Sequence, residues 1–189
     1  MILPIVAYGD PVLKQRAKEI EKEFPKLNEL IDNMYETMYA AKGVGLAAPQ
    51  IGKSIRLFIV DGHPFAEDDE PDMENWKGVF INPEIIEEEG REWAFNEGCL
   101  SIPTIREDIY RKPKVRINYY DENFKFHEKE FEGLKARIIQ HEYDHIEGVL
   151  FTDRISGLKK RLLKNKLANI SKGFVDVNYK MHFPLKKGR

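Results

Sequence analysis

The stretch His141-Glu142-Tyr143-Asp144-His145 contains two histidines four residues apart, with a glutamate directly after the first. It lies in residues 133–147, which are predicted to form a helix closed by Gly148. Residues four apart share one face of a helix, so both imidazoles can reach the same metal ion. Glu142 then stands beside the ion without binding it and can accept a proton from water. The spacing therefore predicts a site for metal-assisted hydrolysis.

The alternative, a pair of surface histidines, is weakened by the preceding turn, because Ile138 and Ile139 make part of this helix face the core. Two histidines leave a catalytic site one protein ligand short. The extended zinc-protease motif HExxHxxGxxH would supply that ligand from residue 151, but this residue is Phe151. The third ligand must therefore come from elsewhere in the chain.

The single cysteine of the chain, Cys99, is the outstanding candidate for this third ligand. It lies in Asn96-Glu97-Gly98-Cys99-Leu100-Ser101, which predicts a tight glycine turn between two strands. A lone cysteine is most often a small buried apolar residue. A thiolate is also a strong metal ligand, and the histidines elsewhere in the chain favour that role here.

Length and composition indicate one globular domain. The chain has 189 residues, of which 42% are hydrophobic and 33% are charged, as is ordinary for a soluble protein. Helices are predicted at residues 25–41, 133–147 and 156–172, and strands at residues 55–60, 79–88, 114–120 and 124–131. We expect an α+β fold with antiparallel or mixed β-sheets around a central helix that carries HExxH, and with an N-terminal and a C-terminal helix.

Charge is distributed unevenly along the chain. We expect a single catalytic domain over residues 1–172, with an acidic surface loop of six carboxylates at 62–78, and a basic, flexible tail over 173–189. From residue 154 onward there are eleven lysines and arginines and one acid, against nineteen bases and thirty-one acids before it. This segregation indicates an anionic partner for the C-terminal segment. A solvated basic helix at 156–172 is the alternative.

Hydropathy indicates a cytoplasmic protein without a membrane partner. No apolar run approaches the roughly 20 residues that a membrane span needs. The first residues, Met1-Ile2-Leu3-Pro4-Ile5-Val6, lack the basic region, the apolar core and the cleavage site of a signal peptide.

Three motifs, in this order, resemble the peptide deformylase family, and the resemblance extends to about residue 170. They are Gly43-Val44-Gly45-Leu46-Ala47-Ala48-Pro49-Gln50, Glu97-Gly98-Cys99-Leu100-Ser101 and His141-Glu142-Tyr143-Asp144-His145. The resemblance implies a hydrolase of protein biosynthesis that removes the N-formyl group from the starting methionine of new proteins and releases formate.

On this resemblance, the metal ligands are Cys99, His141 and His145, and Glu142 is the general acid and base. The resemblance implies Fe²⁺ as the native ion. Affinity order by itself favours Zn²⁺ over Fe²⁺. We expect Zn²⁺, Ni²⁺ or Co²⁺ to act as substitutes.

The resemblance also assigns residues to the substrate. The side chain of Gln50 and the backbone N–H of Leu100 are expected to stabilise the oxyanion, at positions where charge develops. The backbone of Gly45 is expected to pair with an extended peptide. The further substrate contacts expected are Val44, Glu97 and Arg106.

Neighbours of the histidines on the predicted helix extend this assignment. Leu134 and Ile138 precede the first histidine by seven and three residues, share its face and are expected to line the methionine pocket. Arg137 shares that face too and is more polar than the usual neighbour. Asp144 cannot share the face of the histidines, and we expect it to form a salt bridge with Arg111 that orients the metal ligands.

The expected partners are N-formylmethionyl peptides and, through weak contact of the basic C-terminal helix, the ribosome. The bases of this helix are Lys159, Lys160, Arg161, Lys164 and Lys166, and its leucine stripe is expected to pack on the body. Attraction to ribosomal RNA would depend on salt and ignore sequence, because few aromatic residues are present to stack on bases. No DNA partner is expected.

Two other functions stay open at this point. One is an HExxH zinc endopeptidase, which would cleave internal peptide bonds and use a histidine or glutamate as third ligand; Phe151 argues against it. The other is a non-catalytic ribosome-associated binding module, which would have no need to keep Glu142, Gln50 and Cys99 together.

Overall fold

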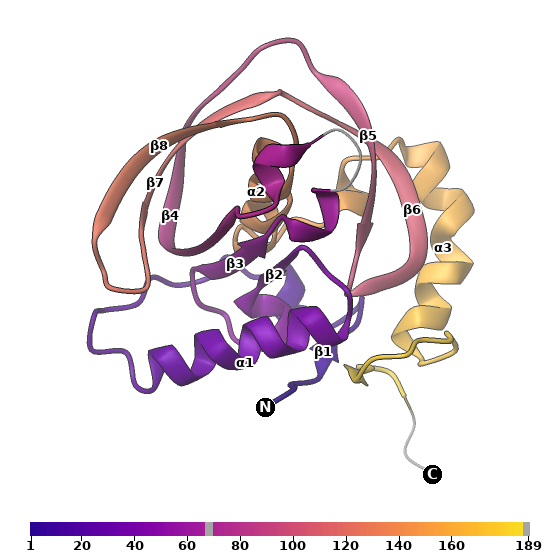
Figure 1. Ribbon diagram of the computed structural model, residues 1–189. Helices are drawn as coiled ribbons and strands as arrows, with labels where there is room; N and C mark the ends of the chain where they lie inside the picture. Colours follow the sequence, from indigo (N-terminus) through magenta and orange to yellow (C-terminus); the bar gives the residue numbers. More distant parts are fainter. Residues whose placement is uncertain (67–69, 187–189) are drawn as a thin grey trace.

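The computed structural model describes residues 1–66 and 70–186 (Figure 1). Within them, three α-helices and antiparallel β-sheets form a mixed α+β fold, which confirms the predicted class. The helices are α1 (Leu27–Ala40), α2 (Gly133–Ile146) and α3 (Gly157–Ser171). None of the described helices is long and apolar enough to cross a membrane.

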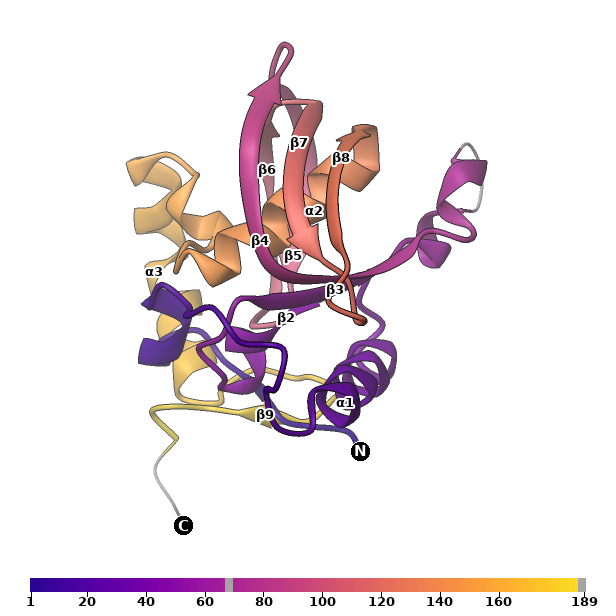
Figure 2. The same ribbon diagram turned by 90° about the vertical axis from the view of Figure 1, so that its left-hand side faces the viewer.

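The main sheet of the described chain has five strands in the order β2-β3-β4-β7-β8, and all neighbours are antiparallel. Their bounds are β2 (Gly45–Ala47), β3 (Leu57–Asp61), β4 (Lys77–Glu89), β7 (Lys114–Tyr120) and β8 (Phe126–Glu132). A separate antiparallel hairpin consists of β5 (Trp93–Cys99) and β6 (Ile102–Arg111). The short strands β1 (Ile5–Val6) and β9 (Met181–His182) pair in parallel. Figure 2 shows how β4, β7 and β8 stand side by side.

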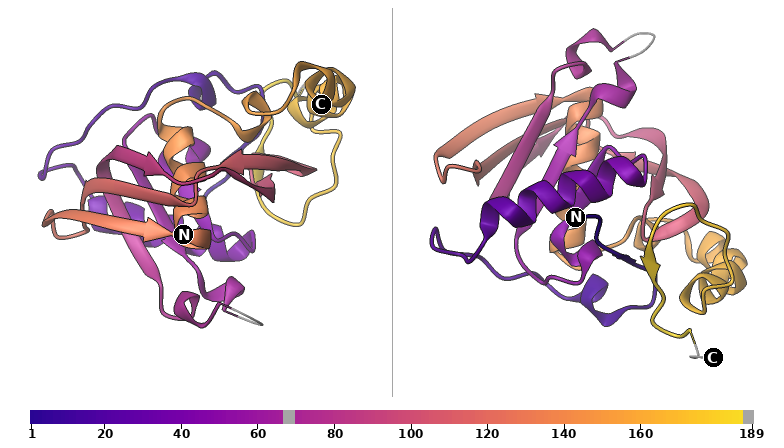
Figure 3. Two further views of the ribbon diagram at one scale, coloured as in Figure 1. Left: turned by 90° about the horizontal axis from the view of Figure 1, so that it is seen from above. Right: turned by 60° about the horizontal axis from the view of Figure 1, so that its bottom comes forward.

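The helix α2 lies between the main sheet and the β5-β6 hairpin (Figures 1 and 3). Alternation along β7 turns Val115 and Ile117 to the inner face of the sheet, where both are fully buried. From the helix, Ala136 and Ile139 join the same apolar cluster. Burial of this side fixes the rotation of α2, and with it the direction of the histidines near its C-terminal end.

Several predicted boundaries hold to within two residues. The helix predicted at 133–147 ends at Ile146, and Gly148 with φ +75° follows its last turn. Ser156 caps α3, because its Oγ accepts a hydrogen bond from Lys159 N at 3.2 Å. The helix predicted at 25–41 begins at Leu27 and buries the predicted stripe, Leu27, Leu30, Ile31, Met34 and Met38.

The predicted acidic loop at 62–78 is more ordered at its base than a plain loop. It contains two 3₁₀ turns, η3 (His63–Phe65) and η4 (Pro71–Met73), and β4 already begins at Lys77. Gly62 N donates to Trp76 O at 2.8 Å, and Met73 is buried. The apolar side chains of this segment therefore anchor it, whereas the acidic residues 67–69 lie outside the described residues.

The segment predicted as a flexible tail, residues 173–189, makes contacts with the body within residues 173–186. The strand β9 in this segment pairs with β1, and Phe183 packs on an apolar cluster of the body. Sequence patterning missed this because a two-residue strand has no detectable period. Residues 187–189 lie outside the described residues.

The leucine stripe of α3 does not pack as expected along its whole length. Leu167 is buried, but Leu158 and Leu162 are 67% and 74% exposed. The buried residues of α3 lie in its second half, and the helix lies beside β6 (Figure 1).

Candidate active site

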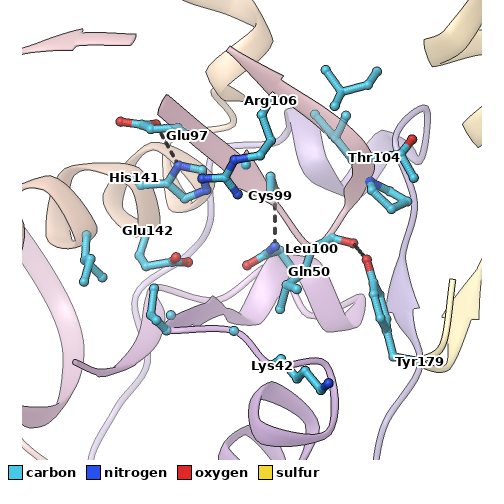
Figure 4. Close-up of a pocket in the computed structure, with 18 of the residues that line it drawn as sticks. Lys42, Gln50, Glu97, Cys99, Leu100, Thr104, Arg106, His141, Glu142 and Tyr179 are labelled. Atoms are coloured by element: carbon cyan, nitrogen blue, oxygen red, sulfur yellow. Dashed lines mark hydrogen bonds and ion pairs between the residues drawn. The ribbon is translucent and has the colours of Figure 1, made fainter. Parts of the chain in front are cut away.

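A cavity of about 690 Å³ opens between α2, the turn that joins β5 to β6, and the segment from Lys42 to Gln50. Figure 4 shows this cavity with the residues that point into it. All three motifs identified in the sequence contribute to its wall. Three segments that are at least 40 positions apart in the chain thus meet at one place.

Cys99, His141 and His145 form one group of potential metal ligands. Their ligand atoms all lie within 4.8 Å of one another, and Cys99 Sγ is 3.4 Å from His145 Nε2. The two imidazole rings, one helical turn apart on α2, have their centroids 5.1 Å apart. One thiol and two imidazoles are a donor set for Zn²⁺, Fe²⁺ and similar ions, and three protein ligands beside a cavity leave a coordination position open. The residues therefore fit a catalytic divalent ion.

Glu97 orients the first of these histidines. His141 Nδ1 lies 3.0 Å from Glu97 Oε2, which leaves Nε2 of the ring for the ion. Arg111 binds both oxygens of the same carboxylate, through Nε at 2.7 Å and Nη2 at 3.0 Å, and Arg137 Nη1 adds a third contact at 3.0 Å. Burial opposes ionisation of Glu97, but the hydrogen bonds from His141 and Arg111 hold its pKa well below the usual range.

The expected role of Glu97 as a substrate contact stays a prediction, and the structure adds a second role, support of the metal ligands. The side chain borders the cavity, yet only 5% of its surface is exposed and both oxygens already accept two hydrogen bonds each. It supports the metal ligands through these contacts.

The expected pair of Asp144 and Arg111 is present at the back of the site. Arg111 Nη1 donates to Asp144 Oδ2 at 2.8 Å, and both side chains are buried. Arg154 adds two contacts of 2.6 Å to the same carboxylate. Because Arg111 also binds Glu97, a continuous ionic network joins α2 to β5 and β6.

Glu142 is packed tightly against Gly45. The carboxylate is 4% exposed, and burial, opposed in part by His141, raises its pKa to about 7. A Cβ on Gly45 would lie 2.7 Å from Glu142 Cδ and 2.8 Å from its Cγ, so a larger residue there would displace the carboxylate. A carboxyl group with a pKa near neutrality can both accept and return a proton.

The amide of Gln50 is held with its nitrogen toward the ligand group. Its Oε1 accepts a hydrogen bond from Ala47 N at 2.9 Å, and its Nε2 lies 3.3 Å from Ser101 Oγ and 3.5 Å from Cys99 Sγ. Leu100 follows the cysteine in the turn and is half-buried beside the amide. Gln50 and Leu100 thus lie beside each other in the cavity wall.

The structure places the other expected pocket residues in the cavity wall: Val44, Arg106, Leu134 and Ile138. Arg106 is held by Asn96, through Nε to Oδ1 at 2.9 Å and Nη2 to the backbone oxygen at 2.6 Å. Its guanidinium also lies against Gly98, where a Cβ would come within 2.7 Å of Nη1.

Sequence reasoning missed some residues that shape the site. Arg137, expected only as a polar neighbour on the face of the histidines, is buried yet lines the cavity, and its guanidinium lies 4.5 Å from the centre of the Trp93 ring. Its position four residues before His141 was the available signal. Nothing in the sequence pointed to Arg154, or to Tyr179, which reaches the cavity from the far end of the chain.

Known proteins resemble the whole chain. A family model described as Polypeptide deformylase matches residues 2–161. The chain is 62% identical to a peptide deformylase of Christiangramia forsetii and 57% identical to one of Flavobacterium johnsoniae, in each case over 100% of both chains. Among solved structures, it is similar to a peptide deformylase from Legionella pneumophila, with a TM-score of 0.77 and 40% identity over 89% of this chain and 95% of that one. The peptide deformylase from Thermotoga maritima gives a TM-score of 0.74 and 42% identity over 82% of this chain and 99% of that one.

Proposed function

The chain belongs to the polypeptide deformylase family, and we propose that the cavity beside Cys99, His141 and His145 is where it works. The protein is a peptide deformylase: it hydrolyses the N-formyl group of formylmethionyl nascent peptides and releases formate. The main support for this site is that one thiol and two imidazoles have their ligand atoms within 4.8 Å of one another, next to a buried glutamate.

The metal-dependent chemistry of the family is assigned to these three ligands. A divalent ion held by Cys99, His141 and His145 would polarise the formyl carbonyl and acidify a water molecule. We assign Fe²⁺ as the native ion, with Zn²⁺, Ni²⁺ or Co²⁺ as substitutes. If iron is native, activity should decay in air faster than in a Ni²⁺-substituted sample, and equal stability of the two would exclude an iron enzyme.

Glu142 is assigned as the proton carrier. It accepts a proton from the attacking water and returns it to the amine that leaves, so that formate and a free amino terminus result. Support comes from its burial, from the pKa of about 7 that burial causes, and from its position between the two histidines. The close packing on Gly45 holds the carboxylate in one place.

We assign two donors, Gln50 Nε2 and the Leu100 N–H, to stabilise the negative charge that develops on the formyl oxygen. Donors fixed before the reaction begins stabilise such charge by about 3 kcal/mol each in other hydrolases. The bond from Ala47 N to Gln50 Oε1 supports this, because it prevents the amide from presenting its oxygen instead.

We assign the other residues of the cavity wall to binding of the peptide substrate. Gly45, next to Val44, is buried beside Glu142 but lies on an edge strand of the main sheet, because among the described residues β2 pairs only with β3. An extended peptide can add to such an edge by backbone hydrogen bonds. Leu134 and Ile138 provide apolar wall for the methionine side chain, and Arg106 is assigned to the peptide backbone beyond it.

The architecture of the enzyme is assigned in the same way. We propose one catalytic domain over residues 1–172, in which α2 is the central, metal-bearing helix. The C-terminal segment to residue 186 belongs to the same body through β9. We place the enzyme in the cytoplasm, where nascent chains emerge.

A weak contact of α3 with the ribosome is a further part of the proposal. Arg161, Lys164 and Lys166 are exposed. Lys159 and Lys160, in contrast, form ion pairs with Glu107 and Asp153. The free charges would attract the RNA phosphates, with a strong dependence on salt.

The two other functions considered are not favoured. An HExxH endopeptidase would need a ligand at residue 151, but Phe151 is buried and the third candidate ligand is Cys99. A binding module without catalysis gives no reason for the packed arrangement of Glu142, Gln50 and Cys99. The test is formate release from formyl-Met-Ala-Ser by anaerobically prepared protein, with cleavage of internal peptide bonds measured in parallel.

A further inference from the structure

After α3 the chain returns to the body and does not leave it. We call residues 174–186 the C-terminal arm. Its strand β9 pairs with β1, where Ala7 N donates to His182 O at 2.8 Å. Met181 and Phe183 of the arm pack on apolar clusters of the body. These contacts anchor the arm at residues 181–183, directly after residues 176–179, which reach the cavity.

The turn after Cys99 is held by both ends of the chain. Tyr179 of the C-terminal arm donates its hydroxyl to Leu100 O at 2.8 Å (Figure 4), and Tyr8 N donates to Ser101 O at 2.8 Å. Two successive carbonyl groups of the turn are thus bound by residues that lie about 170 positions apart. The turn itself is only a few residues long, and in the described part of the chain no strand pairs with Leu100 or Ser101.

Leu100 connects this contact to the chemistry. The residue carries the carbonyl that Tyr179 binds and also the N–H that is assigned to the oxyanion. Fixing the carbonyl restricts the ψ angle of Leu100, and with it the orientation of the turn. An oxyanion donor acts only when it is held at about 3 Å from the place where charge develops. Motion of this turn would therefore weaken stabilisation of the transition state more than binding of the substrate.

The C-terminal arm also forms part of the cavity wall. Asp176, Val177, Asn178 and Tyr179 line the same cavity as Cys99 and Glu142. Figure 4 shows the Tyr179 ring standing beside Leu100, across the turn from His141.

We propose that Tyr179 is a positioning residue for the deformylation reaction: its hydroxyl holds the Leu100 backbone so that the N–H of that residue meets the oxyanion. The C-terminal arm is then one wall of the substrate cleft. The inference rests on the proposed function, because the oxyanion role of Leu100 is part of it.

The test is the Tyr179→Phe variant of the full chain, loaded with metal. Phenylalanine keeps the ring packing and removes only the hydroxyl. We expect kcat to fall by about 3- to 10-fold, the range that one hydrogen bond provides, while KM for formyl-Met-Ala-Ser changes less than about twofold. Amide hydrogen exchange at residues 99–102 should become faster, in apo and loaded protein alike, and metal content should not change. Tyr110→Phe is the matched control, since Tyr110 on β6 is 63% exposed and lies outside the cavity.

The outcomes separate this inference from the function beneath it. If wild type releases formate, and Tyr179→Phe has unchanged kcat and unchanged exchange at residues 99–102, the positioning role is overturned and the proposed function stands. A rise in KM without a fall in kcat also overturns it, because the hydroxyl would then serve ground-state binding. If loaded wild type releases no formate, the proposed function fails, and the inference fails with it.

Discussion

His141 Nδ1 lies 3.0 Å from Glu97 Oε2, so a carboxylate from strand β5 sets the orientation of an imidazole on helix α2. The cysteine that completes the ligand group is two residues after Glu97 on the same strand. One strand therefore supplies a metal ligand and the group that orients another. Arg111 binds Glu97 on its other side and extends this support to Asp144.

Cys99→Ser should weaken metal retention. A serine hydroxyl is a poor replacement for a thiolate, because the alkoxide is hard to form at neutral pH. We expect the variant to lose most of its metal on dialysis against a chelator under conditions in which wild type keeps it, as measured by elemental analysis. Full metal occupancy together with unchanged activity would refute the assignment of Cys99 as a ligand.

Asp144→Asn should reduce both stability and metal affinity. The change removes one of the two carboxylates with which the buried Arg111 pairs, and also the partner of Arg154, which costs about 3 kcal/mol. For a chain of this size that is a fall in Tm of roughly 6–12 °C, and metal affinity should fall by about 10- to 100-fold.

The matched control is Glu107→Gln, which removes the partner of Lys159 in a half-exposed ion pair. It should cost less than about 1 kcal/mol and leave metal affinity unchanged. If both substitutions lowered stability and metal affinity equally, or if Asp144→Asn changed neither, the ionic network of Glu97, Arg111 and Asp144 would not support the metal site.

Neutralising the free bases of α3 should weaken ribosome binding. The variant combines Arg161→Gln, Lys164→Gln and Lys166→Gln, which leaves the buried half of the helix intact. Co-sedimentation at two salt concentrations should show weaker binding and a log–log salt slope smaller by about 2 to 3. Truncation would be a poor test, because Leu167 and Ile170 are core residues.

The control for this variant changes three exposed lysines elsewhere, Lys22, Lys125 and Lys129, to glutamine. Net charge is altered equally in the two variants. Equal binding by both, or wild-type binding that does not change with salt, would exclude a basic contact through α3.

The main elements were predictable because each has a local signal. The HExxH spacing, the capping Ser156 and the apolar stripe of α1 are read within one or two helical turns. The motifs also indicated which residues surround the cavity, since the resemblance covers three separate segments. The hairpin of β5 and β6 was located only at its turn, because the charged residues of β6 interrupt the apolar alternation.

What was missed depends on contacts between distant parts of the chain. Arg154 reaches Asp144 only after α2 has ended and the chain has turned back. The hydroxyl of Tyr179 meets Leu100 across 79 positions of sequence. The four hydrogen bonds that occupy the oxygens of Glu97 come from two other elements, β6 and α2, and have no local signature in the sequence.

Formate release by the Glu142→Gln variant tests the central claim most directly. Glutamine has nearly the same shape and fits against Gly45, but it cannot accept a proton. At a metal content equal to that of wild type, we predict that kcat for formyl-Met-Ala-Ser falls by at least about 100-fold. Turnover within about tenfold of wild type at equal metal content would contradict the account, because the proton would then be carried by another group.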